Sequence, residues 1–171
     1  MSPTPSDIRA AVLTVSDAGA RGERADESGD LIAARLAALP AAVVSRSMVP
    51  DEPAAISLAV VEACAVADLL VVTGGTGLAP RDVTPQALRP LLDYEVPGMA
   101  EAMRAAGLAS TPHAMLSRQV AGVRGSCLVL ALPGSPRGVG ESLDAVWAAL
   151  PHGLRLLRGD RDSHAAAGAA G

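Results

Sequence analysis

Residues 68–85 read DLLVVTGGTGLAPRDVTP, and this stretch holds the clearest signal of the fold. The apolar, β-forming run at 69–72 predicts a short strand that is buried on both faces. A glycine-rich turn at 74–77 ends the strand, and Arg81 and Asp82 follow it. Glycine lets the backbone turn with positive φ and lets a ligand approach the main chain. The turn is therefore either a cradle for a phosphate or a tight connection between strand and loop.

On both sides of this stretch, predicted strands alternate with predicted helices. Strands are expected at 9–17, 43–49, 68–75 and 127–132, with one more before a turn at 124–125. Helices are expected at 31–39, 54–67, 84–93, 97–107, 139–150 and 151–159, with Thr84 as a cap. The alternation predicts a three-layer α/β fold, with a mostly parallel sheet and helices on both faces.

Length and composition limit the organisation and class of the protein. The 171 residues suit one domain, which we expect over 1–159, followed by a disordered tail at 160–171. Only Trp147 and Tyr94 are aromatic, so the core must be aliphatic. All fourteen basic residues are arginines without a clustered stripe, and the net charge is −4, which argues against a nucleic-acid partner.

The sequence also predicts where the protein works and which sites it lacks. The apolar runs are too short for a membrane span, and the start shows no signal-peptide pattern, so we expect a cytoplasmic protein. Cys64 and Cys127 lie in apolar segments and are expected to be buried free thiols rather than a disulfide. The three histidines are scattered, and no zinc site is predicted.

Four predicted strand ends carry small or polar residues. They are Ser16-Asp17, Pro50-Asp51-Glu52, the glycine turn and Pro133-Gly134-Ser135. In a parallel sheet such ends share one edge, where ligands bind. The glycine turn matches neither of two common phosphate motifs: there is no lysine for a P-loop, and Pro80 stands where a dinucleotide fingerprint needs glycine.

Asp51 and Asp82 each follow a strand end by a few residues. Two carboxylates beside a phosphate would repel it unless a divalent cation lay between, and Mg²⁺ is usually held by one or two carboxylates and substrate phosphates. The alternatives are structural: Asp51 as a helix N-cap and Asp82 bonding its own turn.

Four more side chains near these loops are candidates for phosphate contacts. Arg81, Arg118 and Arg137 lie in predicted loops, where a guanidinium can hold a phosphate by two bonds or simply face solvent. Ser135 can offer its hydroxyl to a ligand or cap the helix that follows.

The segments LTVSD, DESG, VPDE, TGGTGLAPRDVTP, EVPGMAEAMR, LSRQVAGVRG, LALPGSPRG and LPHGLRLLRG, in this order over about 9–159, resemble the MogA/MoaB family of molybdenum-cofactor biosynthesis, which includes the gephyrin G domain. The resemblance implies a cytoplasmic homotrimeric molybdopterin adenylyltransferase with a molybdopterin-binding fold. Its substrates would be ATP and molybdopterin, and its cofactor would be Mg²⁺. A later-acting molybdenum-insertion protein would be a partner. The alternative is a MoaB-type protein of the same pathway that binds or carries molybdopterin without catalysis.

The resemblance also assigns residues. Asp51 and Asp82 fall on the family's two important aspartates and are expected to be catalytic and to hold the metal. The substrate contacts are expected from Gly74, Gly75, Thr76, Gly77, Arg81, Pro133, Gly134, Ser135, Asp26 and Ser28. One departure is Val72, where many relatives have threonine; the change is harmless if this side chain points into the core.

Overall fold

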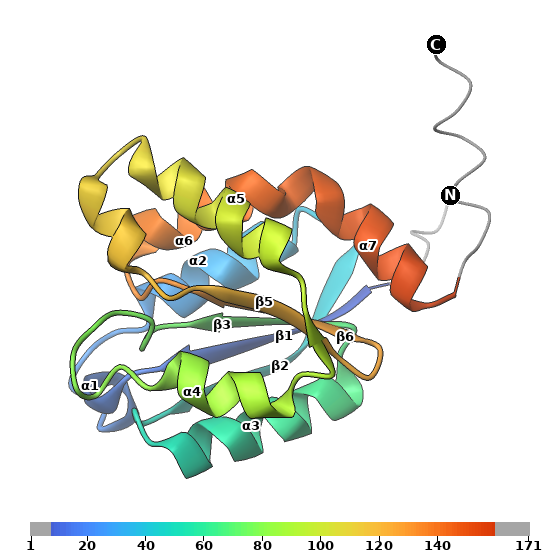
Figure 1. The fold of residues 1–171 in the computed structure, drawn as a ribbon. Coiled ribbons are helices and arrows are strands. Elements are labelled where there is room, and N and C mark those ends of the chain that lie inside the picture. Colours follow the sequence, from blue (N-terminus) through green and yellow to red (C-terminus); the bar gives the residue numbers. More distant parts are fainter. Residues whose placement is uncertain (1–7, 160–171) are drawn as a thin grey trace.

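The computed structural model describes residues 8–159, so the tail predicted at 160–171 lies outside the described residues. The described chain forms one six-stranded sheet between two layers of helices (Figure 1). The predicted three-layer α/β fold is therefore confirmed. No helix within 8–159 is both long enough and apolar enough to span a bilayer.

The sheet has the strand order β2-β1-β3-β6-β5-β4. Its strands are β1 (Ile8–Val15), β2 (Ala41–Val49), β3 (Leu69–Thr73), β4 (Tyr94–Glu95), β5 (Val120–Arg124) and β6 (Cys127–Leu132). The pairs β1 with β2, β1 with β3, and β3 with β6 are parallel. Strand β5 is antiparallel to both of its neighbours, β6 and β4. It is thus the one strand of this sheet that runs against the others.

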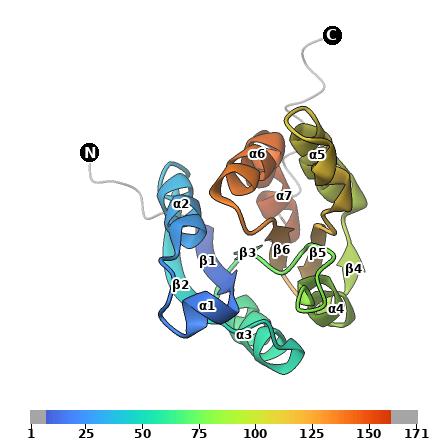
Figure 2. The ribbon, with the colours of Figure 1, turned by 90° about the vertical axis from the view of Figure 1, so that its left-hand side faces the viewer.

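Helices cover both faces of the sheet (Figure 2). They are α1 (Asp17–Ala20), α2 (Glu27–Leu36), α3 (Pro53–Val66), α4 (Thr84–Leu88), α5 (Pro97–Leu108), α6 (Pro136–Val146) and α7 (Leu150–Leu157), with 3₁₀ turns η1 (Arg89–Leu91), η2 (Pro112–Leu116) and η3 (Trp147–Ala149). Helices α2, α5, α6 and α7 lie on one face, and α3 and α4 on the other.

The core consists of two aliphatic clusters, one on each face of the sheet. All five residues of β3 are buried because both faces of this central strand are covered. On the α3 side, the cluster includes the buried Cys127, with the half-buried Cys64 packed against it, and both thiols are free. The predictions of an aliphatic core and of free thiols are therefore confirmed, but only Cys127 is buried as expected.

Local structure differs from the prediction most clearly at helix α2, helix α1 and strand β4. Helix α2 begins four residues earlier than expected, because the Asp26 carboxylate accepts a hydrogen bond from the Gly29 amide and caps it. The short helix α1 occupies part of a predicted loop, with Ser16 as its N-cap. Strand β4 was not predicted because it has only two residues, Tyr94 and Glu95, both exposed.

An ion-pair cluster fastens the end of the sheet where β1 and β3 begin. The Asp68 carboxylate accepts hydrogen bonds from the guanidinium groups of Arg9 and Arg158, each at 2.9 Å, and from the Arg9 amide at 2.8 Å. Burial acts to raise the pKa of Asp68, but these hydrogen bonds outweigh it and lower that pKa to about 2. The cluster joins α7 to the sheet at the end opposite the predicted site.

Candidate active site

The predicted polar strand ends meet at one edge of the sheet (Figure 2). This confirms the prediction that they share an edge. The Ser16 amide donates to the Val49 carbonyl at 2.9 Å, which joins the ends of β1 and β2. The Gly74 amide donates to the Leu132 carbonyl at 3.2 Å, which joins the ends of β3 and β6. The loops after these four strands therefore surround a common space.

The glycine loop, residues 74–77, requires glycine at its first two positions. Gly74 and Gly75 have φ of 99° and 66°, a region that L-residues with a side chain rarely adopt. A Cβ on Gly74 would also collide with the Val15 carbonyl oxygen. Gly74 is buried, whereas Gly75, Thr76 and Gly77 line a hollow, so this part of the loop can offer its backbone to a phosphate.

Thr84 holds the backbone of this loop in place through two hydrogen bonds. The sequence did not predict this role. Its buried hydroxyl donates to the Gly74 carbonyl at 2.9 Å, and its amide donates to the Gly75 carbonyl at 3.1 Å. The predicted cap role of Thr84 is wrong, because Val83 is the N-cap of α4 and makes no side-chain cap bond. The hydroxyl is used instead to hold the backbone of the loop.

Arg118 fixes the other side of the loop. Its guanidinium donates to the Gly77 carbonyl at 2.7 and 3.0 Å and to the Asp82 carbonyl at 2.6 Å. Its amide donates to the Thr76 carbonyl at 2.8 Å. Arg118 therefore holds the loop rather than offering its guanidinium to a phosphate. The Thr76 hydroxyl is itself 3.2 Å from that of Ser117.

Asp51 and Asp82 flank the glycine loop. A Cβ placed on Gly75 would lie 3.2 Å from Asp51 Oδ1, and one placed on Gly77 would lie 2.7 Å from Asp82 Oδ2. The structure thus brings together the two carboxylates that the sequence singled out. Asp82 also bonds its own turn, since its Oδ2 atom accepts a hydrogen bond from the Ala79 amide at 3.0 Å. The contact that the structural alternative predicted for Asp82 is therefore present.

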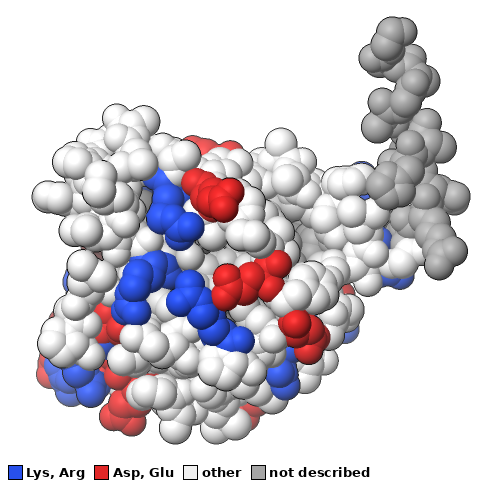
Figure 3. Space-filling view, in the orientation of Figure 1, with Lys and Arg blue, Asp and Glu red and all other residues white. Residues whose placement is uncertain are grey.

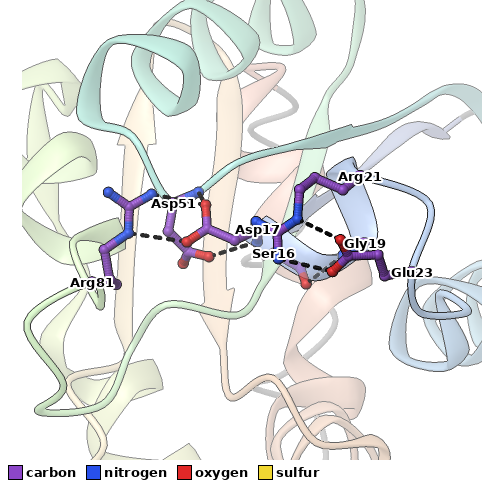
Figure 4. A network of polar contacts seen from close by, with 7 residues as sticks. All are labelled: Ser16, Asp17, Gly19, Arg21, Glu23, Asp51 and Arg81. Atoms are coloured by element: carbon purple, nitrogen blue, oxygen red, sulfur yellow. Dashed lines mark hydrogen bonds and ion pairs between the residues drawn. The ribbon is translucent and has the colours of Figure 1, made fainter.

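The structural alternative for Asp51 is wrong. Glu52, not Asp51, is the N-cap of α3. The Asp51 Oδ2 atom accepts a hydrogen bond from the Asp17 amide at 2.9 Å, and the Asp51 amide donates to Asp17 Oδ1 at 3.0 Å (Figure 4). Burial raises the pKa of the Asp51 carboxyl, and the nearby charges of Asp17 and Asp82 add to this effect.

Arg81 pairs with Asp17 in the same network. Its Nε and Nη2 atoms donate to Asp17 Oδ2 and Oδ1 at 3.0 and 2.8 Å. The hydrogen bond from Arg81, followed by the bond from the Asp51 amide, lowers the pKa of Asp17. Figure 3 shows acidic and basic side chains side by side at this end of the molecule.

Asp26 and Ser28 line a hollow at the same edge of the sheet, and Gly134 borders this hollow too. The Asp26 carboxylate accepts from the Thr14 hydroxyl at 2.9 Å and from Arg46 at 2.9 Å, so neighbouring groups already use it. The Ser28 hydroxyl donates to the Gly134 carbonyl at 2.7 Å. These two residues therefore shape the edge through contacts within the protein.

The turn Pro133-Gly134-Ser135 forms the wall between this hollow and a second hollow, which lies over the glycine loop. The Thr73 hydroxyl donates to the Pro133 carbonyl at 2.7 Å, which ties the turn to β3. The Ser135 hydroxyl accepts from the Gly138 amide at 3.1 Å, so the predicted helix cap is confirmed. Val72 is fully buried and points into the core, so its departure from the family pattern removes no hydroxyl from the site.

The second hollow lies over the glycine loop. It is lined by residues of that loop, by Asp82, by the turn at 133–135, and by His113, Leu116 and Ser117 from the chain before β5. It adjoins a more apolar pocket between α5 and α6, which Met103, Gln119 and Ser142 help to line. Arg137, which also borders that pocket, donates to Glu141 at 3.0 Å. The hollow thus combines bare backbone, a carboxylate and an adjoining apolar surface.

A comparison with family models and known proteins gives consistent results. The model described as "Probable molybdopterin binding domain" matches residues 11–152. The molybdopterin adenylyltransferase of Helicobacter pylori strain J99 is 38% identical over 157 residues, which cover 90% of this chain and 89% of that protein.

Two further relatives also match most of this chain. A molybdenum cofactor biosynthesis bifunctional protein of Synechococcus elongatus is 42% identical over 153 residues, which cover 89% of this chain but only 48% of that protein. The crystal structure of the molybdopterin biosynthesis enzyme MoaB from Thermus thermophilus is 53% identical, with a TM-score of 0.82. That match covers 89% of this chain and 97% of the solved one.

Proposed function

The chain belongs to the probable molybdopterin binding domain family, and we propose that it is a molybdopterin adenylyltransferase of molybdenum-cofactor biosynthesis. In this reaction an oxygen of the terminal phosphate of molybdopterin attacks the α-phosphorus of ATP. The bond from that phosphorus to the oxygen bridging to the β-phosphate breaks. The products are adenylyl-molybdopterin and pyrophosphate, so the enzyme is a nucleotidyltransferase that binds ATP.

The observation that carries this proposal is that Asp51 and Asp82 both lie beside the glycine loop, Asp51 near Gly75 and Asp82 near Gly77. A protein that only bound a phosphate would gain nothing from two negative charges at this place. A transferase that brings two polyanions together gains from them, because carboxylates can hold the cation that screens the phosphates.

The residues present fit Mg²⁺ as this cation. Within 8–159 no group of three or more His, Cys, Asp or Glu residues is arranged to hold a metal ion. Asp51 and Asp82 would hold the ion only together with phosphate oxygens, which is the mode Mg²⁺ prefers. When bound, Mg²⁺ would neutralise charge on the triphosphate and on the leaving pyrophosphate.

The chain's own groups supply position rather than covalent chemistry. The glycine loop, held by Thr84 and Arg118, would offer the backbone of residues 75–77, which lines the hollow, to the molybdopterin phosphate. The turn at 133–135 and the adjoining apolar pocket would hold the pterin. Holding the two phosphates in line converts a slow encounter of two anions into a reaction within one complex.

The test is an assay of the purified protein with molybdopterin and Mg-ATP, which measures adenylyl-molybdopterin and pyrophosphate. We expect product from the wild type, and we expect Asp82→Asn to lose it while molybdopterin binding is retained. Asp144→Asn, at an exposed ion pair with Arg35, is the control and should keep full activity. Tight molybdopterin binding by the wild type without any product would support the alternative, a MoaB-type carrier.

Three further features are proposed from the family resemblance. We propose that Arg81 contributes to the site, that three copies of the chain assemble into a homotrimer, and that the protein acts in the cytoplasm before a molybdenum-insertion protein. Size-exclusion chromatography with light scattering tests the trimer, because a monomer or dimer would contradict it.

A further inference from the structure

We propose that Asp17 is a positioning residue for Asp51, and that Arg81 acts on the site through Asp17. The inference rests on the proposed adenylyl transfer and names two residues that prepare its geometry. The resemblance to relatives assigned Arg81 to substrate contact and gave Asp17 no role.

The first step is the reciprocal pair of hydrogen bonds between Asp17 and Asp51. Each residue donates its amide to the carboxylate of the other, at 2.9 and 3.0 Å (Figure 4). The pair joins the start of α1 to the loop after β2. Because Oδ2 of Asp51 is engaged by the Asp17 amide, rotation of the carboxylate is restricted. Its Oδ1 atom then lies beside Gly75 of the glycine loop, on the side that the Thr84 hydroxyl also contacts.

The second step is that the carboxylate of Asp17 is fully used within the protein. Oδ1 accepts from the Asp51 amide and from Arg81 Nη2, and Oδ2 accepts from Arg81 Nε. A carboxylate with these partners is poorly suited to bind substrate or metal itself. Its role is therefore to hold the backbone of Asp51 through the Asp51 amide, and so to position the Asp51 carboxylate indirectly.

The third step concerns Arg81, which precedes Asp82 on the loop that carries the second carboxylate. By pairing with Asp17, it connects the Asp82 loop to the segment that orients Asp51. The side chains of Arg81 and Asp17 are 59% and 28% exposed, and an ion pair this exposed adds little to stability. Its loss should therefore change the relative positions of Asp51 and Asp82 more than the stability of the fold.

The test begins with Asp17→Asn, which keeps an oxygen to accept from the Asp51 amide but removes the charge that binds Arg81. We expect kcat to fall about 10- to 100-fold, as for a displacement of about 1 Å at a reacting group. We expect the molybdopterin Kd to change less than about twofold and the Tm to stay near the wild type. Glu23→Gln is the matched control: it breaks the two-bond pair of Arg21 with Glu23, which does not contact Asp51, and should leave kcat unchanged.

A double-mutant cycle with Arg81→Met separates action through Asp17 from direct contact with substrate. If Arg81 acts through Asp17, the double variant should lose little more kcat than either single variant. Additive losses, or a normal kcat in Asp17→Asn, would overturn the inference.

A crystal structure of Asp17→Ala tests the positioning independently of the reaction. Alanine keeps the main-chain amide that donates to Asp51 Oδ2 but removes the carboxylate that accepts from the Asp51 amide, so we expect the backbone at residue 51 to shift and to carry its carboxylate out of the wild-type conformation. If Asp51 keeps that conformation, Asp17 does not position it, whatever the activity. If the wild type makes no adenylyl-molybdopterin, the proposed function fails, but this structural comparison still decides the role of Asp17.

Discussion

The Ser28 hydroxyl donates a hydrogen bond of 2.7 Å to the carbonyl oxygen of Gly134, and so links the start of α2 to the turn after β6. The two residues are far apart in sequence and line the same hollow as Asp26, while Gly134 also lines the hollow over the glycine loop. Ser28 is buried, so water has poor access to replace this bond. The hydroxyl thereby fixes one wall of the proposed pterin site.

Ser28→Ala should weaken molybdopterin binding. A hydrogen bond of this kind contributes about 1 kcal/mol, and if that amount is lost from binding, Kd should rise about fivefold. Isothermal titration with molybdopterin measures the change. Ser57→Ala is the matched control, since the Ser57 hydroxyl also donates to a backbone carbonyl, that of Ala87, but away from the site. An equal effect of both changes would show that the Ser28 bond has no special role in binding.

Gly77→Ala should reduce activity more than stability. The added Cβ would lie 2.7 Å from Asp82 Oδ2, so the carboxylate must move, while the backbone needs no positive φ. We expect kcat to fall about tenfold or more, with the free energy of unfolding changed by less than about 1 kcal/mol.

The control for this change is Gly140→Ala in α6, where an added Cβ meets nothing within 4 Å. It should stabilise the helix by up to about 1 kcal/mol and leave kcat unchanged. Urea denaturation and the adenylylation assay measure both quantities. Full activity of Gly77→Ala would mean that the position of Asp82 does not limit the reaction.

Thr84→Val should destabilise the protein because it leaves the Gly74 carbonyl without its buried hydroxyl donor. The free energy of unfolding should fall by about 1–3 kcal/mol, as measured by urea denaturation. Thr84→Ser keeps the hydroxyl and should retain more of the stability. If Val and Ser variants are equally stable, the bond contributes nothing measurable.

Stability should fall in acid because of Asp68. Its pKa is lowered in the folded protein from 3.8 to about 2, so the folded state binds the proton less readily than the unfolded state. The stabilisation is present above about pH 4 and is lost as the pH falls toward 2; it amounts to at most about 2 kcal/mol. Urea denaturation between pH 2 and 6 should show this loss, and Asp68→Asn should flatten this part of the curve.

The sequence predicted those parts of the fold that depend on local patterns. The apolar run at 69–72 and the glycines that follow it lie where expected, because burial on both faces and positive φ leave a direct mark on residue type. The start of helix α2 leaves less trace, because its first turn, residues 27–30, is polar and the apolar pattern begins only at Leu31. Strand β4 has no such mark, since pairing with β5 alone defines its two residues.

The candidate site was predictable in its carboxylates but not in their supports. Asp51 and Asp82 followed from the strand ends and the family resemblance. The bonds of Asp17 to Asp51 depend on the register of β1 against β2, which residue types do not reveal. Thr84 and Arg118 were assigned other roles because the fold of the glycine loop decides which carbonyls they reach.

The reversed direction of β5 has a consequence for the composition of the site. A strand that runs against its neighbours begins at the edge where they end. The chain therefore enters β5 beside the glycine loop, and this entry brings Ser117 and Arg118 within reach of Thr76 and Gly77. A parallel strand in the same place would start at the far edge and leave that flank open. Because β5 is inverted, the segment that precedes it lies at the site together with the four loops that follow β1, β2, β3 and β6.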